Sequence, residues 1–248
     1  MSSADHSHSP LAQFEVHPLI PIKLGGFDIS FTNASLWMVI SVAVALLLLL
    51  AASRRSALVP GRVQSLSEML IEFISGTVRD SAGKEGMKYF PLIFSLFMFV
   101  LLCNLTGMIP YSFTVTSHII VTFAFAICLF LLFTMIAIVK HGPKKFFLFF
   151  MPAGSPLWIA PLIYPIELFS YLARPISLSV RLAANMMAGH TMLKVIAGFV
   201  VMLGVLGGWA PFALLVVLTG FEIGIAILQA YIFTVLTCVY LNDALHLH

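Results

Sequence analysis

One apolar stretch of this chain carries side chains that could bind and move protons. Residues 166–190 read IELFSYLARPISLSVRLAANMMAGH, and their polar members are Glu167, Arg174, Arg181, Asn185 and His190. On a helix that advances about 100° per residue, the first four lie within about 40° of one another and form one polar face. A charge at the centre of a bilayer costs roughly 2.5–3.5 kcal/mol, and charges kept there mark ion or proton pathways. We therefore expect this stretch to guard an ion path.

Arg181 is the expected gate of that path. Its guanidinium stays protonated at any working pH, so it cannot pass a proton on. A fixed positive charge instead attracts a carboxylate and favours its ionised form. The alternative is an arginine that is satisfied by Glu167 within the bundle. His190 lies about 180° from Arg181 on the helical wheel, so it belongs to another face unless the helix is kinked near Ala188 and Gly189.

Composition places the chain in a membrane. Of its 248 residues 60% are hydrophobic and 9% are charged, whereas soluble domains have about 25% charged residues. The net charge of +3 is dispersed and forms no stripe for nucleic acid. No G-x-x-x-x-G-K-S/T sequence for a nucleotide is present. The cysteines have no CxxC spacing and are interpreted as small buried hydrophobes: Cys103, Cys128 and Cys238.

The predicted fold class is an all-α integral membrane protein. Residues 1–35 are expected to be an extracytoplasmic tail, and residues 36–248 a single membrane domain. The elements predicted in that domain are an N-terminal transmembrane helix at 36–53, an amphipathic cytoplasmic-surface helix at 62–82, a transmembrane hairpin of helices at 90–109 and 118–139, and a C-terminal hairpin of long, strongly tilted helices at 160–205 and 211–242.

Basic residues set the expected orientation. They gather at the ends of the predicted spans as Arg54, Arg55, Arg62, Lys140, His141, Lys144 and Lys145. The loop at 110–118 has no Lys or Arg. By the positive-inside rule the basic ends are cytoplasmic, so the N-terminus is outside and the C-terminus inside. The last helix carries Glu222 and Gln229 seven residues apart, which places both on one face.

Two stretches of the long helices resemble subunit a of F-type ATP synthases. They are SLSVRLAANMMAGH at residues 177–190 and LQAYIFTVLTCVYLNDA at residues 228–244. The resemblance extends through nearly the whole chain, including LCNLTGMIPY at residues 102–111. It implies that Arg181 is the family's essential arginine. The matching asparagine, upstream acid and last-helix glutamine are Asn185, Glu167 and Gln229.

The resemblance also assigns His190 and Glu222 to a pair. Many bacterial members carry Glu at the position of His190 and His at the position of Glu222, whereas mitochondrial and related bacterial members have the arrangement seen here. This exchange indicates that the two side chains meet or share one polar channel, and we expect them to line the outer half-channel. Glu167 is expected either to line the inner half-channel or to pair with Arg174.

The function implied by the resemblance is that of a proton-translocating stator subunit. Two offset half-channels and an arginine gate would face a rotating ring of c subunits, so that ion flow turns the ring and drives ATP synthesis. The other implied partners are peripheral-stalk b-type subunits, the remainder of the ATP synthase complex and the lipid bilayer. No nucleic acid, cofactor or metal is implied. The subunit would be non-catalytic by itself and would lie in the cell inner membrane as a multi-pass protein.

Two other classes of membrane protein remain open at this point. A stand-alone proton-coupled secondary transporter could use Arg181 and Glu167 for its substrate, but such folds usually show internal repeats and none is visible here. A haem-binding or structural subunit of a redox complex would use His118, His141 and His190. That class needs histidine pairs that face each other at similar depth, and only His190 lies well inside an apolar helix.

Overall fold

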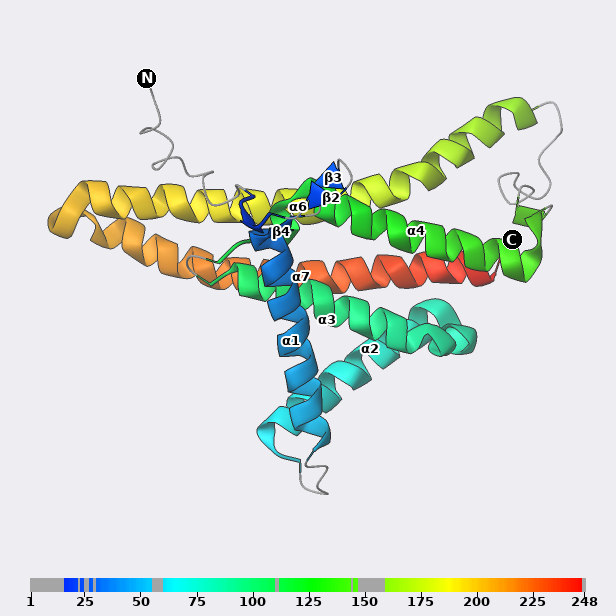
Figure 1. The fold of residues 1–248 in the computed structure, drawn as a ribbon, viewed down its shortest axis with the longest axis horizontal. Helices are drawn as coiled ribbons and strands as arrows, with labels where there is room; N and C mark the ends of the chain where they lie inside the picture. The colour runs from blue at the N-terminus through cyan, green and yellow to red at the C-terminus, as the bar shows by residue number, and fades with distance from the viewer. Residues whose placement is uncertain are drawn as a thin grey trace. The chain divides into compact units, whose positions relative to one another are not determined.

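The computed structural model of the chain describes residues 16–21, 23–24, 27–28, 30–54, 60–109, 112–143, 145–146 and 159–246. Figure 1 labels most of the elements. In chain order they are β1 (Pro18–Ile20), β2 (Lys23–Leu24), β3 (Phe27–Asp28), β4 (Phe31–Thr32), α1 (Asn33–Ser53), α2 (Arg62–Gly86), η3 (Met87–Tyr89), α3 (Phe90–Gly107), η4 (Val115–Ser117), α4 (Ile119–His141), α6 (Ala160–Gly207) and α7 (Trp209–Leu245).

Five helical stretches in the described residues are long and apolar enough to cross a membrane. They are Asn33–Ser53, Arg62–Gly107, Ile119–His141, Pro161–Gly204 and Trp209–Leu245. The predicted fold class, an all-α integral membrane protein, is confirmed. Predicted and observed helix ends differ by a few residues; α2, for example, continues to Gly86 beyond the predicted range 62–82.

The segment before α1 contains short strands, whereas a tail was predicted for residues 1–35. β1 pairs with β4 and β2 with β3, both antiparallel. The start of α1 is tied to this segment, because the Asn33 backbone N–H donates to the His17 carbonyl at 3.1 Å. The Thr32 hydroxyl accepts from the Ser35 backbone N–H and caps the helix.

The chain forms two compact units, each built from three separate segments. Unit 1 comprises Met1–Arg54, Met98–Ile119 and Leu182–Ala230. Unit 2 comprises Arg55–Phe97, Ile120–Arg181 and Tyr231–His248. Helices α3, α6 and α7 each contribute to both units, so their two parts are described separately.

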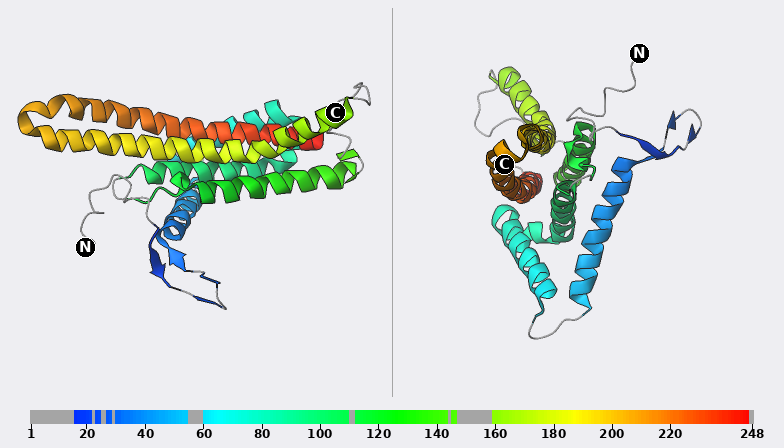
Figure 2. Two further views of the ribbon diagram at one scale, coloured as in Figure 1. Left: turned by 90° about the horizontal axis from the view of Figure 1, so that it is seen from above. Right: turned by 90° about the vertical axis from the view of Figure 1, so that its left-hand side faces the viewer.

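In unit 1 the second part of α6 and the first part of α7 run side by side in opposite directions (Figures 1 and 2). Ala226 and Ala230 of α7 are fully buried, as is Asn104 of α3. Small residues such as the two alanines let helices approach closely. Close packing matters in a membrane, because the hydrophobic effect does not drive helices together there. Helix α1 joins this unit through a hydrogen bond between the Ser41 and Thr106 hydroxyls at 3.0 Å.

In unit 2, helix α2 buries one face of its surface inside the unit. Ile74, Val78 and Ala82 are fully buried and recur every four residues, as an amphipathic helix requires. The stripe ends at a break, because Gly83 has φ 67° and ψ −166° inside α2. A positive φ is accessible to glycine at little cost.

Helix α6 keeps helical backbone angles at Pro175, although a proline inside a helix often causes a kink. Its non-helical residue is Gly204, with φ 62° and ψ −161°. Proline already has a helical φ, and its cost is the loss of one backbone hydrogen bond. The site residues of α6 therefore lie on a continuous helix.

Candidate functional site

Helices α6 and α7 bring two amide side chains of unit 1 into contact. Asn185 Nδ2 donates a hydrogen bond to Gln229 Oε1 at 3.1 Å. Gln229 is 1% exposed, and its Nε2 has no hydrogen-bond partner in the described part of the chain. A buried amide nitrogen of this kind is suited to bind water. The pair can therefore hold water without carrying a charge.

A buried acid and imidazole face each other in the same unit. His190 Nδ1 lies 3.7 Å from Glu222 Oε1, and the two side chains are 10% and 7% exposed. His190 Nε2 and both carboxylate oxygens lack a hydrogen-bond partner among the described residues. Buried polar groups are normally satisfied by protein or by ordered water. The unpartnered atoms of the two groups are therefore places where ordered water can bind, and both groups can exchange protons with such water.

Gly189 allows Glu222 to lie directly against α6. A β-carbon at this glycine would sit 2.4 Å from Glu222 Oε1 and 2.9 Å from its Cδ. Any side chain at position 189 would therefore displace the carboxylate. The meeting of His190 with Glu222 needs no kink at Gly189, because α6 stays helical there.

Asn104 of α3 is a further buried amide in unit 1. It is 0% exposed, and its Nδ2 donates to the Ala226 carbonyl oxygen at 3.1 Å. Its Oδ1 has no hydrogen-bond partner within the part of the chain that the structure describes. Ala226 lies between Glu222 and Gln229 along α7, so Asn104 adds a third polar group at an intermediate level.

Arg181, in unit 2, is exposed. Neither it nor Glu167, which is half-buried, forms an ion pair with another described residue. The structure thus gives no support to an arginine satisfied by Glu167 within the bundle. A permanent charge on an apolar helix requires water or a partner outside the chain.

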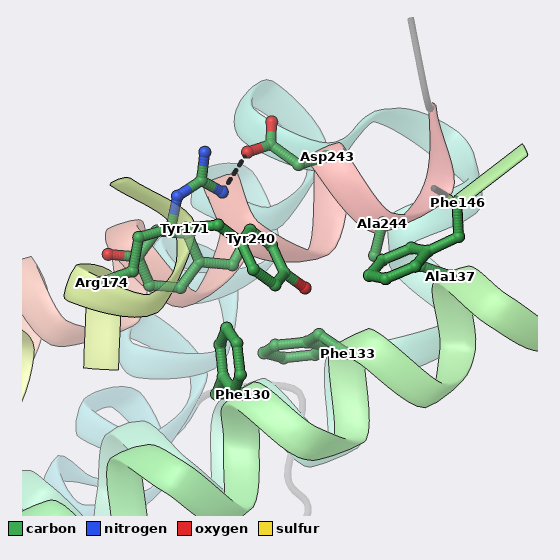
Figure 3. A pocket seen from close by; sticks show the side chains of 9 residues that line it. All are labelled: Phe130, Phe133, Ala137, Phe146, Tyr171, Arg174, Tyr240, Asp243 and Ala244. Carbon is green, nitrogen blue, oxygen red and sulfur yellow. Dashed lines mark hydrogen bonds and ion pairs between the residues drawn. The ribbon is translucent and has the colours of Figure 1, made fainter. Parts of the chain in front are cut away.

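Arg174 is paired with Asp243 rather than with Glu167. Its Nη1 lies 2.6 Å from Asp243 Oδ2, and its Cζ is 5.3 Å from the ring centroids of both Tyr171 and Tyr240. Figure 3 shows the guanidinium beside the two rings and directed at the carboxylate, at the edge of a cavity of about 20 Å³. Of the two roles expected for Glu167, the pairing with Arg174 is not found among the described residues, because Arg174 pairs with Asp243 and makes cation–π contacts with Tyr171 and Tyr240.

Comparison with known sequences decides the family. The sequence pattern described as "ATP synthase A chain" matches residues 35–242, which is most of the chain. The chain belongs to the ATP synthase A chain family. ATP synthase subunit a of Rhodospirillum rubrum is 56% identical over 241 residues, covering 97% of this chain and 100% of the relative. ATP synthase subunit a of Pelagibacter ubique (strain HTCC1062) is 56% identical over 241 residues, covering 97% and 98%.

Membership of the ATP synthase A chain family confirms the resemblance read from the motifs. The stand-alone transporter finds no support in these matches. The three histidines of the redox alternative have separate neighbours: His118 stacks on Phe113 at 4.9 Å between ring centroids, and the imidazole of His141 lies 3.1 Å from the Leu245 carbonyl oxygen. In the described residues no group of three His, Cys, Asp or Glu side chains could hold a metal ion.

For this member of the ATP synthase A chain family, the predicted site residues divide into two sets. The structure joins Asn185 to Gln229 and His190 to Glu222, and it leaves Arg181 and Glu167 without an ion pair in the described chain.

Two polar residues of interest were missed as site residues. Asn104 and Asp243 both stand inside the motifs that carried the resemblance. An amide or acid in an apolar helix was the signal that could have identified them.

Proposed function

We propose that this chain is the proton-translocating stator subunit of the membrane sector of an ATP synthase. The observation that carries the proposal is Arg181, an exposed guanidinium on an apolar helix in a chain of the ATP synthase A chain family. Arginine cannot release its proton. The partner we infer for it is a carboxylate on a rotating ring of small c subunits.

The proposed gate works through the charge of Arg181. A ring carboxylic acid must be neutral to face lipid, since a bare charge there is costly. Next to the guanidinium its ionised form is favoured. The acid therefore releases its proton on one side of Arg181 and takes one up on the other. If the two access paths open to opposite sides of the membrane, ion flow turns the ring, with about 2.3 kcal/mol available per charge and 100 mV.

The outer access path, in this proposal, follows the buried polar groups of unit 1. His190 and Glu222 exchange protons, and histidine suits this role because it ordinarily titrates near neutral pH. Further along the path, Asn104 of α3, which contacts α7 at Ala226, and Gln229 of α7 then hold water. The support is that all four residues carry a buried polar atom with no hydrogen bond in the described chain. Such atoms are the places where ordered water enters a protein interior.

The inner access path is proposed to run beside Glu167. Arg174 is neutralised by Asp243, which leaves the half-buried Glu167 without an ion pair in the described chain. A carboxylate in this state can accept and release protons. Along α6, Asn185 lies between Arg181 and His190, and thus between the proposed gate and the proposed outer path.

The proposed setting is the cell inner membrane. The N-terminus would be extracytoplasmic and the C-terminus cytoplasmic, as the basic residues at the helix ends indicate. The subunit would contact the c-ring, the peripheral-stalk b-type subunits and the remainder of the complex. It would be non-catalytic by itself, because ATP chemistry would take place in the attached head.

Replacement of Arg181 tests the proposal. In the assembled complex, reconstituted into vesicles, Arg181→Ala is expected to abolish ATP-driven proton uptake and ATP synthesis, while the detached head hydrolyses ATP at the normal rate. Arg79→Ala removes an exposed charge from α2 and should leave pumping unchanged. Subunit composition is checked for both variants. Normal coupled pumping by the Arg181 variant would overturn the proposal.

A further inference from the structure

Unit 2 has an open cavity of about 670 Å³ beside the end of α4. Its lining divides into a charged part and an apolar part. The charged part comes from the end of α2, η3 and the last turn of α4, and includes three lysines: Lys84, Lys88 and Lys140. No part of the proposed proton path lines this cavity, so the inference below is independent of the proposed function.

The charged part carries an excess of positive charge. Glu85 forms an ion pair with Lys140. The positive charges of Lys84 and Lys88 are therefore not neutralised by this carboxylate. These four side chains are exposed. The break at Gly83 immediately precedes the charged run of α2. An anion at the mouth of the cavity would therefore meet two ammonium groups, those of Lys84 and Lys88, that form no ion pair with another described residue.

The apolar part is a stripe on α4. Leu132, Met135, Ile136 and Val139 line the cavity and recur at i, i+3, i+4 and i+7, which places them on one face. Met135 is 65% exposed and Val139 82% exposed. At 1.5 Å per residue the stripe extends for about 10 Å from the lysines towards the middle of the helix. It runs in the direction of the bilayer interior, because Lys140 marks the end of the apolar span.

We infer that this cavity binds an anionic phospholipid, with the phosphate beside the lysines and an acyl chain along α4. Basic pockets at the ends of transmembrane helices bind anionic head groups. A free phosphate would use the lysines but not the stripe. A zwitterionic lipid would bring its cationic group to an already positive rim. The combination of positive rim and adjoining apolar stripe fits an anionic lipid.

The test uses the assembled complex in vesicles that contain phosphatidylglycerol with a photoreactive acyl chain. Adducts are expected on the cavity-facing stripe of α4, and unlabelled phosphatidylglycerol should compete with them. Phosphatidylcholine and inorganic phosphate should not compete. Lys84→Gln and Lys88→Gln should each reduce the adduct yield about fivefold at limiting lipid, the effect of about one charge near a membrane surface.

Lys145→Gln is the matched control, since Lys145 is exposed after the end of α4 but does not line the cavity. It should leave the yield unchanged, and Lys84→Arg should retain binding. Adducts spread evenly over the helices, or equal competition by phosphatidylcholine, would overturn the inference. Replacement of lipid adducts by cross-links to a neighbouring subunit would also overturn it, because a protein would then occupy the cavity.

Discussion

Gly189 and Glu222 lie too close for a β-carbon to fit between them. An added β-carbon would sit 2.4 Å from Glu222 Oε1. The absence of a side chain at Gly189 thus gives the carboxylate room beside His190, whose Nδ1 is 3.7 Å from the same oxygen. The observed position of the acid is therefore available only because residue 189 of α6 is a glycine.

Gly189→Ala is expected to impair proton transfer while the complex still assembles. The methyl group must push the Glu222 carboxylate away from His190, and misplacement of a reacting group by about 1 Å can cost up to a hundredfold in rate. Passive proton flow through the reconstituted membrane sector should fall by about tenfold or more. Adding Glu222→Asp shortens the acid and should restore part of the flow.

Gly198→Ala provides the control on the same helix. Apart from its chain neighbours and the backbone of its own helix turn, a β-carbon at Gly198 would meet no heavy atom of the described residues within 4 Å, so this variant should conduct protons normally. Equal losses in the two alanine variants would show that α6 tolerates no change at all, and that the contact with Glu222 is not the cause.

The hydrogen bond between Asn185 and Gln229 gives a second prediction. Gln229→Leu keeps the volume but removes both the acceptor for Asn185 Nδ2 and the Nε2 donor, which has no hydrogen-bond partner among the described residues. We expect proton flow to fall about tenfold, equivalent to ~1.4 kcal/mol. The exchange of Asn185→Gln with Gln229→Asn keeps the summed length of the two side chains and should recover most of the flow. Failure of the exchange, combined with normal conduction by the leucine variant, would contradict the proposed role.

The sequence predicted the pairing in unit 1 better than that in unit 2. His190 and Glu222 were expected to meet because their residue types are exchanged together in the family. Arg174 offered no such signal, because on the wheel it shares a face with Glu167. Its actual partner, Asp243, comes from another helix, and helix periodicity says nothing about which helices become neighbours. The contact between Gly189 and Glu222 was missed for the same reason.

The helices themselves were predictable, because long apolar runs and basic flanks are local properties. The short strands before α1 were not, since residues 1–35 show no sustained alternation of apolar and polar residues. The break at Gly83 likewise has no clear signal beyond a glycine within an amphipathic pattern. Pro175 shows the opposite case, in which a strong local signal leaves the helix intact.

The ion pair of Arg174 with Asp243 is predicted to stabilise unit 2. The side chains are 27% and 32% exposed, so Asp243→Ala should cost about 1–3 kcal/mol, between surface and buried pairs. Arg174→Lys should cost less, because it keeps the charge but loses the planar contact with Tyr171 and Tyr240. Thermal unfolding of the purified complex measures both, with the exposed Asp80→Ala as control. An unchanged midpoint for Asp243→Ala would contradict the prediction.

Asn104 allows the water path to be tested away from any ionisable group. Asn104→Leu is nearly isosteric and removes the donor to the Ala226 carbonyl, an oxygen that α7 can satisfy within its own helix. Loss of a neutral hydrogen bond costs about 1 kcal/mol, so the complex should assemble. The Oδ1 atom, which has no partner in the described part of the chain, is lost as well, and an apolar side chain holds no water. Proton flow should therefore fall while ATP hydrolysis by the detached head is unchanged. Asn104→Gln, which keeps the amide, should conduct better than the leucine variant; the reverse order would mean that packing around Ala226, and not water, is what Asn104 provides.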